Sequence, residues 1–419
     1  MDDMGRALAG GEKQYMLGGG NPAKIPEVEA LWRARLIELL DQGDALERML
    51  GNYGPPQGHP SFIEALAELF NREFGWNLTP RHIAITNGSQ MAFFLLLNML
   101  SGAEGAALGD RARRRILFPL LPEYIGYADQ GLTPDCFVAC RPIVDRLDEH
   151  THKYRVDFEA VSALLEDGRA GRAEAIGAIC VSRPTNPSGN VLTDDEMRRL
   201  DELARRYEVP LIVDNAYGAP FPDIVFDEVT DGPVGPIWNE NIVLGMSLSK
   251  IGLPGLRTGI IVASPDVITA LSRANAVLSL ANSAVGPVLT EPLVRSGAIL
   301  SVAREAIRPF YRERAAEARA VLTAAIDDDV AFSVHRVEGS IFLWLWLPGL
   351  PISSRELYGR LKRRNVLVVP GEYFFFGDAD GDDWRHARQC LRINYGQQPS
   401  DVAAGIGIIA DEVNTLCRH

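Results

Sequence analysis

A single lysine, Lys250, follows a short apolar run and stands close to groups that suit a phosphate. Two serines precede it in Ser247-Leu248-Ser249-Lys250, and Arg257 follows seven residues later. A lysine acts as a Schiff-base nucleophile only when its amine is partly deprotonated, which burial promotes. Hydroxyl and guanidinium groups donate the hydrogen bonds that a phosphate dianion accepts. The cluster therefore favours a covalently held, phosphate-bearing cofactor, although a lone lysine is usually a surface charge.

Two further polar segments follow apolar runs or lie in stiffened loops. Asp214 comes directly after Leu211-Ile212-Val213, and an acid at the end of a buried strand is costly unless a cation, such as a protonated pyridine nitrogen, pairs with it. Asn186 lies in a loop that Pro184 and Pro187 stiffen. Taken singly, Asp214 could equally cap a helix or form a structural salt bridge, and Asn186 could be an ordinary turn residue.

The segment Asn87-Gly88-Ser89-Gln90 stands between a strand-like run, 83–86, and a helical pattern that extends to about residue 100. Amides at a helix N-terminus, together with a glycine and a hydroxyl, suit a phosphate. A turn with a serine N-cap explains the same residues. The segment therefore carries weight only alongside the other strand ends.

The elements that must position these side chains alternate along the middle of the chain. Apolar runs predict strands over 83–86, 116–118, 176–181, 211–213, 242–244 and 259–262. Near-continuous apolar runs are typical of strands buried on both faces, and helices between them imply crossover connections. Ligands bind beyond the carboxyl ends of the strands in such open sheets. We therefore predict an α/β fold with a mainly parallel sheet between helices and the polar segments along one edge.

The pattern changes after about residue 310. Helices are predicted over 311–325 and 355–364, and strands over 340–347, 366–369 and 391–395. We predict a large cofactor-binding domain over 48–310, a C-terminal small α+β domain over 311–419, and an N-terminal segment, 1–47, that packs with the small domain. Capping-box patterns predict helix starts at Ser61…Glu64, Thr193…Glu196 and Ser353…Glu356.

Bulk composition excludes several classes of protein. The chain has 419 residues, of which 47% are hydrophobic and 23% charged, as in soluble globular proteins. A net charge of −13 argues against nucleic acid or an anionic membrane as a partner. Five cysteines without a CxxC pair and seven histidines without ligand spacing predict neither a disulfide framework nor a metal site. The sequence has no signal-peptide pattern and no apolar run long enough to cross a bilayer, so we expect a cytoplasmic protein.

The order and spacing of Asn186, Asp214, Tyr217, Lys250 and Arg257 resemble those of the fold-type I enzymes that use pyridoxal 5′-phosphate (PLP), specifically the class I/II aminotransferases. The separations are 28 residues from Asn186 to Asp214 and 36 from Asp214 to Lys250. The resemblance covers almost the whole chain. The segments that look like valine–pyruvate aminotransferases are 17–22, 122–127, 182–191, 214–222, 247–259 and 338–346. The resemblance implies a seven-stranded large-domain sheet and a homodimer with shared active sites.

The resemblance also implies roles for single residues. Lys250 would hold the cofactor covalently and move a proton between the amino acid's α-carbon and the cofactor. Asp214 would pair with the pyridine nitrogen, and Asn186 and Tyr217 would bond to the 3′ oxygen. Tyr124 would stack on the ring. Phosphate contacts are implied for Gly88, Ser89, Gln90, Ser247, Ser249 and Arg257, and, from the neighbouring subunit, for Tyr53.

Substrate contacts follow from the same resemblance. Arg392 would grip the α-carboxylate, because its planar fork matches a carboxylate and a lysine does not. The backbone of Gly19 and Gly20 would lie beside that carboxylate, with Asn186 nearby. An ordinary salt bridge remains the alternative for Arg392, and a turn aromatic within its own subunit is the alternative for Tyr53.

The implied activity is transamination by a ping-pong mechanism, with valine or alanine as the amino acid and pyruvate or 2-oxoisovalerate as the 2-oxo acid. No second arginine can be placed for a side-chain carboxylate, which favours neutral aliphatic substrates. A β-lyase or a biosynthetic enzyme acting on an unusual amino acid stays open, as does, remotely, a non-catalytic PLP-binding sensor domain. Three segments depart from the family pattern and leave side-chain specificity open: Gly371–Phe376, Asp378–Asp383 and Ala103–Arg115.

Overall fold

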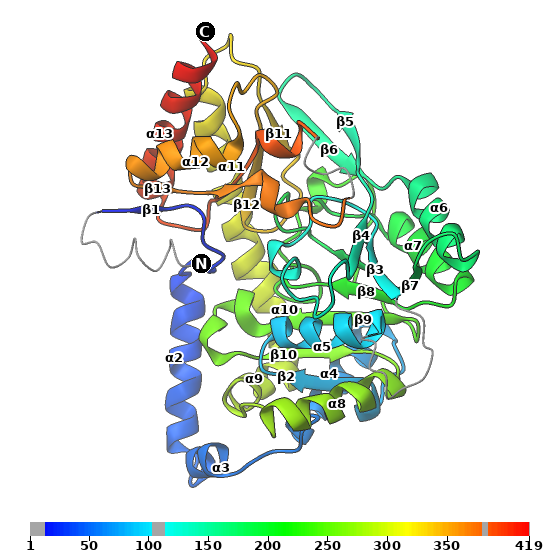
Figure 1. Cartoon of the computed structure of the whole chain (residues 1–419). Coiled ribbons are helices and arrows are strands. Elements are labelled where there is room, and N and C mark those ends of the chain that lie inside the picture. The colour runs from blue at the N-terminus through cyan, green and yellow to red at the C-terminus, as the bar shows by residue number, and fades with distance from the viewer. Residues whose placement is uncertain (1–12, 103–113, 379–383, 419) are drawn as a thin grey trace.

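The computed structural model describes residues 13–102, 114–378 and 384–418. Its strands form two large sheets, with helices packed around both (Figure 1). Two of the sequence segments that depart from the family pattern, Ala103–Arg115 and Asp378–Asp383, lie almost entirely outside the described residues. In the described ranges, no helix combines the length and apolarity that crossing a membrane requires.

The larger sheet has seven strands in the order β2-β10-β9-β8-β7-β3-β4. Their bounds are β2 Ile83–Thr86, β3 Arg114–Phe118, β4 Phe137–Ala139, β7 Ala175–Ser182, β8 Leu211–Asp214, β9 Ile242–Ser247 and β10 Gly259–Val262. Neighbouring strands are parallel except at β10, which is antiparallel to both β2 and β9. The predicted mainly parallel, seven-stranded sheet is confirmed. β4 was not predicted: it lies at the edge of the sheet, and of its three residues only Phe137 is buried.

Alternate residues of these strands supply two separate apolar cores. In β9, for example, Ile242 and Leu244 belong to one core and Val243 to the other. One face is covered by α5 (Ser89–Ser101) and α8 (Pro265–Ser279). The opposite face is covered by α4 (Pro60–Phe74), α6 (Phe158–Arg169), α7 (Asp194–Arg206) and α9 (Val285–Ser296). Burial on both faces explains why the strands read as continuous apolar runs.

The second sheet has six strands in the order β14-β15-β12-β11-β6-β5. Their bounds are β5 Ile143–Arg146, β6 Thr151–Arg155, β11 Ser333–His335, β12 Phe342–Trp346, β14 Val369–Pro370 and β15 Cys390–Asn394. The surrounding helices are α10 (Ala298–Ser301), which continues through a π-helical turn into α11 (Arg308–Ala325), α12 (Ser354–Arg363) and α13 (Pro399–Cys417). The hairpin β5–β6 joins this sheet by pairing β6 parallel to β11, although it lies far earlier in the chain.

The N-terminal segment touches both parts of the molecule. β1 (Tyr15–Met16) pairs in parallel with β13 (Val366–Leu367). α2 (Pro26–Asp41) then extends away from it toward α3 (Ala45–Gly51), as Figure 1 shows. The Trp32 indole donates a hydrogen bond to the Ile251 carbonyl at 2.8 Å, which ties α2 to the turn that carries Lys250. The exact division of the chain into domains stays a prediction.

The predicted helix starts are right in two of three places. Thr193 and Ser353 each form the full capping box with the glutamate three residues later. The start predicted at Ser61 is wrong, because α4 already begins at Pro60. Proline suits the first helical position since it needs no amide donor there. The Ser61 hydroxyl instead donates to Glu291.

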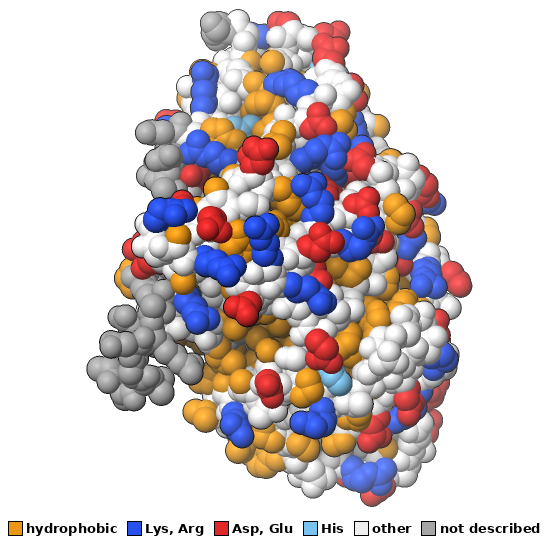
Figure 2. Space-filling model, turned by 90° about the vertical axis from the view of Figure 1, so that its right-hand side faces the viewer, with side chains coloured by type: hydrophobic (Ala, Val, Ile, Leu, Met, Phe, Trp, Pro, Cys, Tyr) orange, Lys and Arg blue, Asp and Glu red, His pale blue; other side chains and the backbone are white. Residues whose placement is uncertain are grey.

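The face that carries α6 and α7 mixes charges of both signs (Figure 2). On α7, Arg198 pairs with Asp195 and Arg205 pairs with Asp201, in both cases within one helical turn. Such pairs at spacings of three and four residues lie side by side on a helix surface. The pairs leave this helix surface with little net charge.

Candidate active site

The polar segments predicted from sequence meet at the carboxyl edge of the seven-stranded sheet. Asp214 is the last residue of β8, and the register of the parallel strands sets Ser182 of β7 on one side of it and Gly245 of β9 on the other. Lys250 lies in the 3₁₀ turn Leu248–Ile251, immediately after β9. Three neighbouring strands therefore deliver an acid, a lysine and the loop of Asn186 to one place.

Lys250 lies in an environment that favours its neutral amine. Its Nζ donates a hydrogen bond to the Gly20 carbonyl at 2.5 Å and lies 5.3 Å from the centroid of the Tyr217 ring. Burial, together with the positive charges of Arg392 and Arg257, lowers the pKa of Lys250 to about 8, against the opposing influence of Asp214. An amine with this pKa is a better nucleophile and proton acceptor near neutral pH than a free lysine.

Asp214 is a buried carboxylate held by two neutral donors. The Tyr127 hydroxyl donates to Oδ2, and the Ala216 amide donates to Oδ1 at 3.0 Å. Burial raises the pKa of Asp214 to about 6, although both hydrogen bonds and the charge of Lys250 lower it. In the described part of the chain, no lysine, arginine or histidine bonds to this carboxylate. The site is therefore suited to a cationic hydrogen-bond donor.

Arg392 is a buried cation whose hydrogen-bond partners are neutral. Nη1 donates to Asn186 Oδ1 and Nη2 to the Gly18 carbonyl, each at 2.7 Å, and Nε has no partner among the described residues. The guanidinium carbon lies 4.1 Å from the Phe342 ring centroid and 5.1 Å from that of Phe374. Burial lowers the pKa of Arg392 to about 10. A buried guanidinium without an acid is suited to bind an incoming carboxylate.

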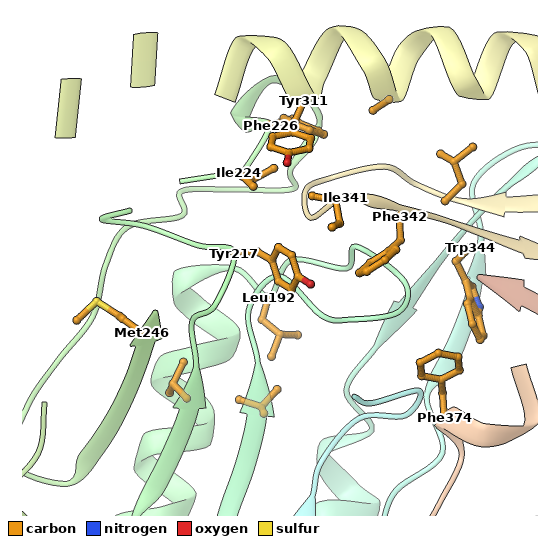
Figure 3. Packing of buried hydrophobic residues seen from close by; sticks show 14 of the residues in the cluster. Leu192, Tyr217, Ile224, Phe226, Met246, Tyr311, Ile341, Phe342, Trp344 and Phe374 are labelled. Carbon is orange, nitrogen blue, oxygen red and sulfur yellow. The ribbon is translucent and has the colours of Figure 1, made fainter. Parts of the chain in front are cut away.

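Aromatic side chains line the region around Arg392. Figure 3 shows Tyr217, Phe342 and Trp344 in a row, with Phe374 below Trp344. The Tyr217 and Phe342 rings meet edge to face at 6.0 Å, and those of Trp344 and Phe374 at 5.6 Å. This flank is apolar apart from the Tyr217 hydroxyl and the Trp344 indole, and the latter donates to Tyr154 at 2.8 Å. It favours an uncharged substrate side chain.

The start of α5 and the turn after β9 form a corner that suits an anion. Gly88 is the N-cap of α5 with φ +90°, and a Cβ there would clash with Nη2 of Arg257. The guanidinium of Arg257 therefore lies directly against the first turn of α5, whose leading amides have no partner within the helix. The Ser249 amide donates to Ser247 Oγ at 3.0 Å, and the two hydroxyls are 2.9 Å apart. These groups match a phosphate.

Other residues predicted for the site lie around this centre. The partly buried Tyr124 packs edge to face on Tyr127 at 5.2 Å. Gln90 is exposed and its amide donates to the Gly126 carbonyl at 3.3 Å. Ser89 begins α5 beside Gly88. Gly19 accepts a hydrogen bond from Asn394 Nδ2 at 2.5 Å.

Tyr53 is the one predicted residue that stands apart from these groups. It is 86% exposed, on the segment that follows α3. Within the described ranges it forms no hydrogen bond and no ring contact. Its predicted contact with a neighbouring subunit stays a prediction.

Several residues of the site had no role in the sequence-based prediction. They are Glu123, Tyr127, Phe342, Phe374 and Asn394. Tyr127 follows three residues after Tyr124 in the segment 122–127, and Asn394 follows two residues after Arg392. Glu123, Phe342 and Phe374 lie in segments that the sequence singled out, 122–127, 338–346 and 371–376, but their roles depend on partners from distant segments.

Comparisons with known proteins agree with one another. The family model described as aminotransferase class I and II matches residues 135–409. A valine–pyruvate aminotransferase of Escherichia coli is 44% identical over 398 residues, which are 95% of this chain and 90% of that protein. A solved putative amino-acid aminotransferase from Psychrobacter arcticum has a TM-score of 0.93 and 45% identity, covering 99% of this chain and 94% of that one. The valine–pyruvate aminotransferase AvtA from Salmonella typhimurium has a TM-score of 0.87 and 42% identity, covering 100% and 99% of the two chains.

Proposed function

The chain belongs to the class I and II aminotransferase family and has the fold-type I architecture of these enzymes, and from this premise we propose that it transfers an amino group between valine and pyruvate with PLP held on Lys250. One observation carries the proposal. Lys250 Nζ donates to the Gly20 carbonyl and Arg392 Nη2 donates to the Gly18 carbonyl. An amine and a guanidinium thus bond to carbonyls two residues apart in the chain, and an α-amino acid carries an amino group and a carboxylate on one carbon.

The residues present fit PLP. Asp214 is buried without a basic partner in the described part of the chain and suits the protonated pyridine nitrogen. The corner of Gly88, Ser247, Ser249 and Arg257 offers amides, hydroxyls and a guanidinium to a phosphate. These donors leave Lys250 free for the covalent link. In the same proposal Ser89 and Gln90 also bond to the phosphate, Asn186 and Tyr217 to the 3′ oxygen, and Tyr124 stacks on the ring.

The residues of this chain then perform separate tasks. PLP, when bound, supplies the electron sink that weakens the bonds at the amino acid's α-carbon. Arg392 orients the substrate through its α-carboxylate, with Gly19, Gly20 and Asn186 beside it. Lys250 Nζ accepts the proton from the amino acid's α-carbon and donates it to the cofactor. Asp214 keeps a proton on the pyridine nitrogen, and the Tyr127 hydroxyl holds the carboxylate in place.

The choice of valine and pyruvate rests on the relatives' names and on the aromatic flank. The E. coli relative is named a valine–pyruvate aminotransferase. Phe342 and Phe374 enclose the Arg392 guanidinium, and Tyr217 lies edge to face on Phe342. An uncharged aliphatic side chain loses no hydrogen bonds beside such rings, whereas a second carboxylate would be desolvated without a partner.

The direct test mixes the purified holoenzyme with L-valine and pyruvate. We expect L-alanine and 2-oxoisovalerate in equal amounts, and neither product from Lys250→Ala. A cofactor absorbance band that borohydride bleaches, and that Lys250→Ala lacks, would support the attachment site. Release of pyruvate from a β-substituted amino acid, without alanine from valine and pyruvate, would overturn transamination in favour of elimination.

The proposed working form is a homodimer. Apolar side chains are exposed on α2, on α3 and the segment after it, and at the end of α8: Leu36, Ile37, Leu40, Leu50, Tyr53, Val277, Leu278 and Leu280. Exposed apolar groups of this kind mark protein interfaces in soluble enzymes. In the proposed dimer Tyr53 reaches the phosphate site of the other subunit. Sedimentation of the holoenzyme as a monomer, or an unchanged PLP affinity in Tyr53→Ala, would contradict this arrangement.

A further inference from the structure

Glu123 is a fully buried carboxyl group to which the reaction assigns no task. It follows β3 and immediately precedes Tyr124. Oε1 accepts from the Ser182 amide at 2.7 Å, and Oε2 accepts from the Ser182 hydroxyl at 2.5 Å and from the Tyr124 amide at 2.9 Å. No basic side chain bonds to it in the described ranges. Burial raises the pKa of Glu123 to about 7, although all three hydrogen bonds lower it.

The three segments that meet at Glu123 each carry a group of the proposed site. Tyr124 supplies the ring proposed to stack on the cofactor. Ser182 ends β7, directly before the loop of Asn186. The backbone amide of Glu123 also donates to the Phe374 carbonyl at 3.0 Å, and the Phe374 ring lies against the Arg392 guanidinium at 5.1 Å.

We propose that Glu123 is a positioning residue: it fixes the Tyr124 ring against the cofactor and keeps that ring in register with the Asn186 loop and with Arg392. This inference rests on the proposed function, since the ring that Tyr124 meets is that of PLP. A buried anion without a cationic partner is costly for stability. A buried Glu123 beside the site is explained if it orders the groups that touch the cofactor.

The donor pattern explains why a carboxylate is needed. The Tyr124 amide and the Ser182 amide can only donate, and they approach different oxygens of Glu123. All three partners donate to Glu123 and so favour its ionised form, which accepts at both oxygens, whereas a glutamine has one acceptor oxygen and one NH₂ group. Glu123→Gln therefore sets an N–H against one of the two backbone N–H groups. The Ser182 hydroxyl can rotate to accept a hydrogen bond from the glutamine NH₂. The favoured orientation therefore points this NH₂ toward the Tyr124 amide, which loses its acceptor.

The test is a double-mutant cycle with Glu123→Gln and Tyr124→Ala, read as the dissociation constant of PLP and as the induced circular dichroism of the bound cofactor. We expect Glu123→Gln to raise the PLP dissociation constant about tenfold and to weaken the circular dichroism band, because the Tyr124 amide loses its acceptor and the Tyr124 ring is then no longer held against the cofactor. In the Tyr124→Ala background the same change should raise it less than about threefold, since the ring that Glu123 positions is already gone. Should Glu123→Gln fail to fold, Ser182→Ala replaces it with an expected increase of about threefold.

The matched control is Asn414→Ala, far from the site. Asn414 is also buried, and its side chain bonds to the Asp327 amide and the Ala325 carbonyl, each at 3.1 Å. We expect this variant to lower the melting temperature and to leave the PLP dissociation constant unchanged. If Glu123→Gln behaves like the control, or raises the dissociation constant equally in both backgrounds, Glu123 supports only the fold and the inference is wrong. A wild-type protein that binds no PLP would overturn the proposed function itself, whereas the results just described for Glu123→Gln would overturn only the role of Glu123.

Discussion

Replacing Arg392 by lysine keeps the positive charge but removes the planar fork. In the structure both Nη atoms are engaged, with Asn186 Oδ1 and with the Gly18 carbonyl, each at 2.7 Å. The guanidinium carbon also lies 4.1 Å from the Phe342 ring centroid and 5.1 Å from that of Phe374. A lysine amine offers a single point of contact and cannot hold these partners and a substrate carboxylate in one plane.

The size of the effect follows from the contact that is lost. One charge-assisted hydrogen bond to the substrate carboxylate contributes about 1.5–3 kcal/mol. At 1.4 kcal/mol for each tenfold change, Arg392→Lys should lower kcat/KM for L-valine roughly 10- to 150-fold. The loss should fall mainly on KM if the carboxylate is held equally in the ground state and the transition state.

Steady-state kinetics with L-valine and pyruvate measure this effect, and PLP affinity serves as the internal control. We expect Arg392→Lys to leave the PLP dissociation constant within about twofold of wild type, because Arg392 is assigned to the substrate and not to the phosphate. The matched variant Arg257→Lys should do the reverse and weaken PLP binding more than it raises KM. Wild-type kcat/KM in Arg392→Lys, or equal losses of PLP and substrate binding, would refute the assignment.

Three further expectations concern stability and pH. The folded-state pKa of Lys250 is about 8, below its ordinary 10.5. The unfavourable contribution of Lys250 to apoprotein stability is therefore fully present below pH 8 and is relieved as pH rises from 8 to 10.5. Lys250→Met should raise the unfolding free energy of the apoprotein at pH 7 by on the order of 1–3 kcal/mol, allowing for the partial exposure of the amine, and a lower unfolding free energy in the variant would contradict the burial described. The folded-state pKa of Asp214 is raised from 3.8 to about 6, so its contribution to apoprotein stability falls as pH rises through that window. Asp214→Asn should therefore flatten the pH dependence of urea unfolding between pH 4 and 6, and it should abolish activity. An unchanged pH dependence of unfolding would count against the burial of the carboxylate. Phe374 is fully buried, so Phe374→Ala should destabilise the protein by about 3–5 kcal/mol in urea unfolding and raise KM for valine, and a variant with normal KM would remove Phe374 from the substrate flank.

The cofactor centre could be predicted from sequence because parallel strands deliver their ends to one edge. Asp214 and Lys250 each follow a buried apolar run, and the register between β8 and β9 brings those runs together. The predicted strands match the observed ones for the same reason, since burial on both faces leaves a continuous apolar signature. Local pattern and global fold agree at these positions.

The residues that sequence did not reveal have partners from remote parts of the chain. Tyr127 bonds to Asp214 across 87 residues, and Glu123 bonds to Ser182 across 59. The hairpin β5–β6 joins the second sheet through pairing with β11, which no local pattern indicates. Phe374 comes from a segment of unusual composition, and only the fold shows that its ring lies against Arg392. Non-local contacts of this kind depend on the tertiary arrangement and leave no spacing to read.

In the proposed reaction this chain moves an amino group from valine to pyruvate through a cofactor on Lys250. A single-turnover experiment tests it most directly. The holoenzyme is mixed with L-valine alone, separated from free amino acid, and then given pyruvate. We expect one equivalent of 2-oxoisovalerate per cofactor in the first step and one equivalent of L-alanine in the second, with neither from Lys250→Ala. Absence of 2-oxoisovalerate in the first step, or alanine formed without prior exposure to valine, would contradict it.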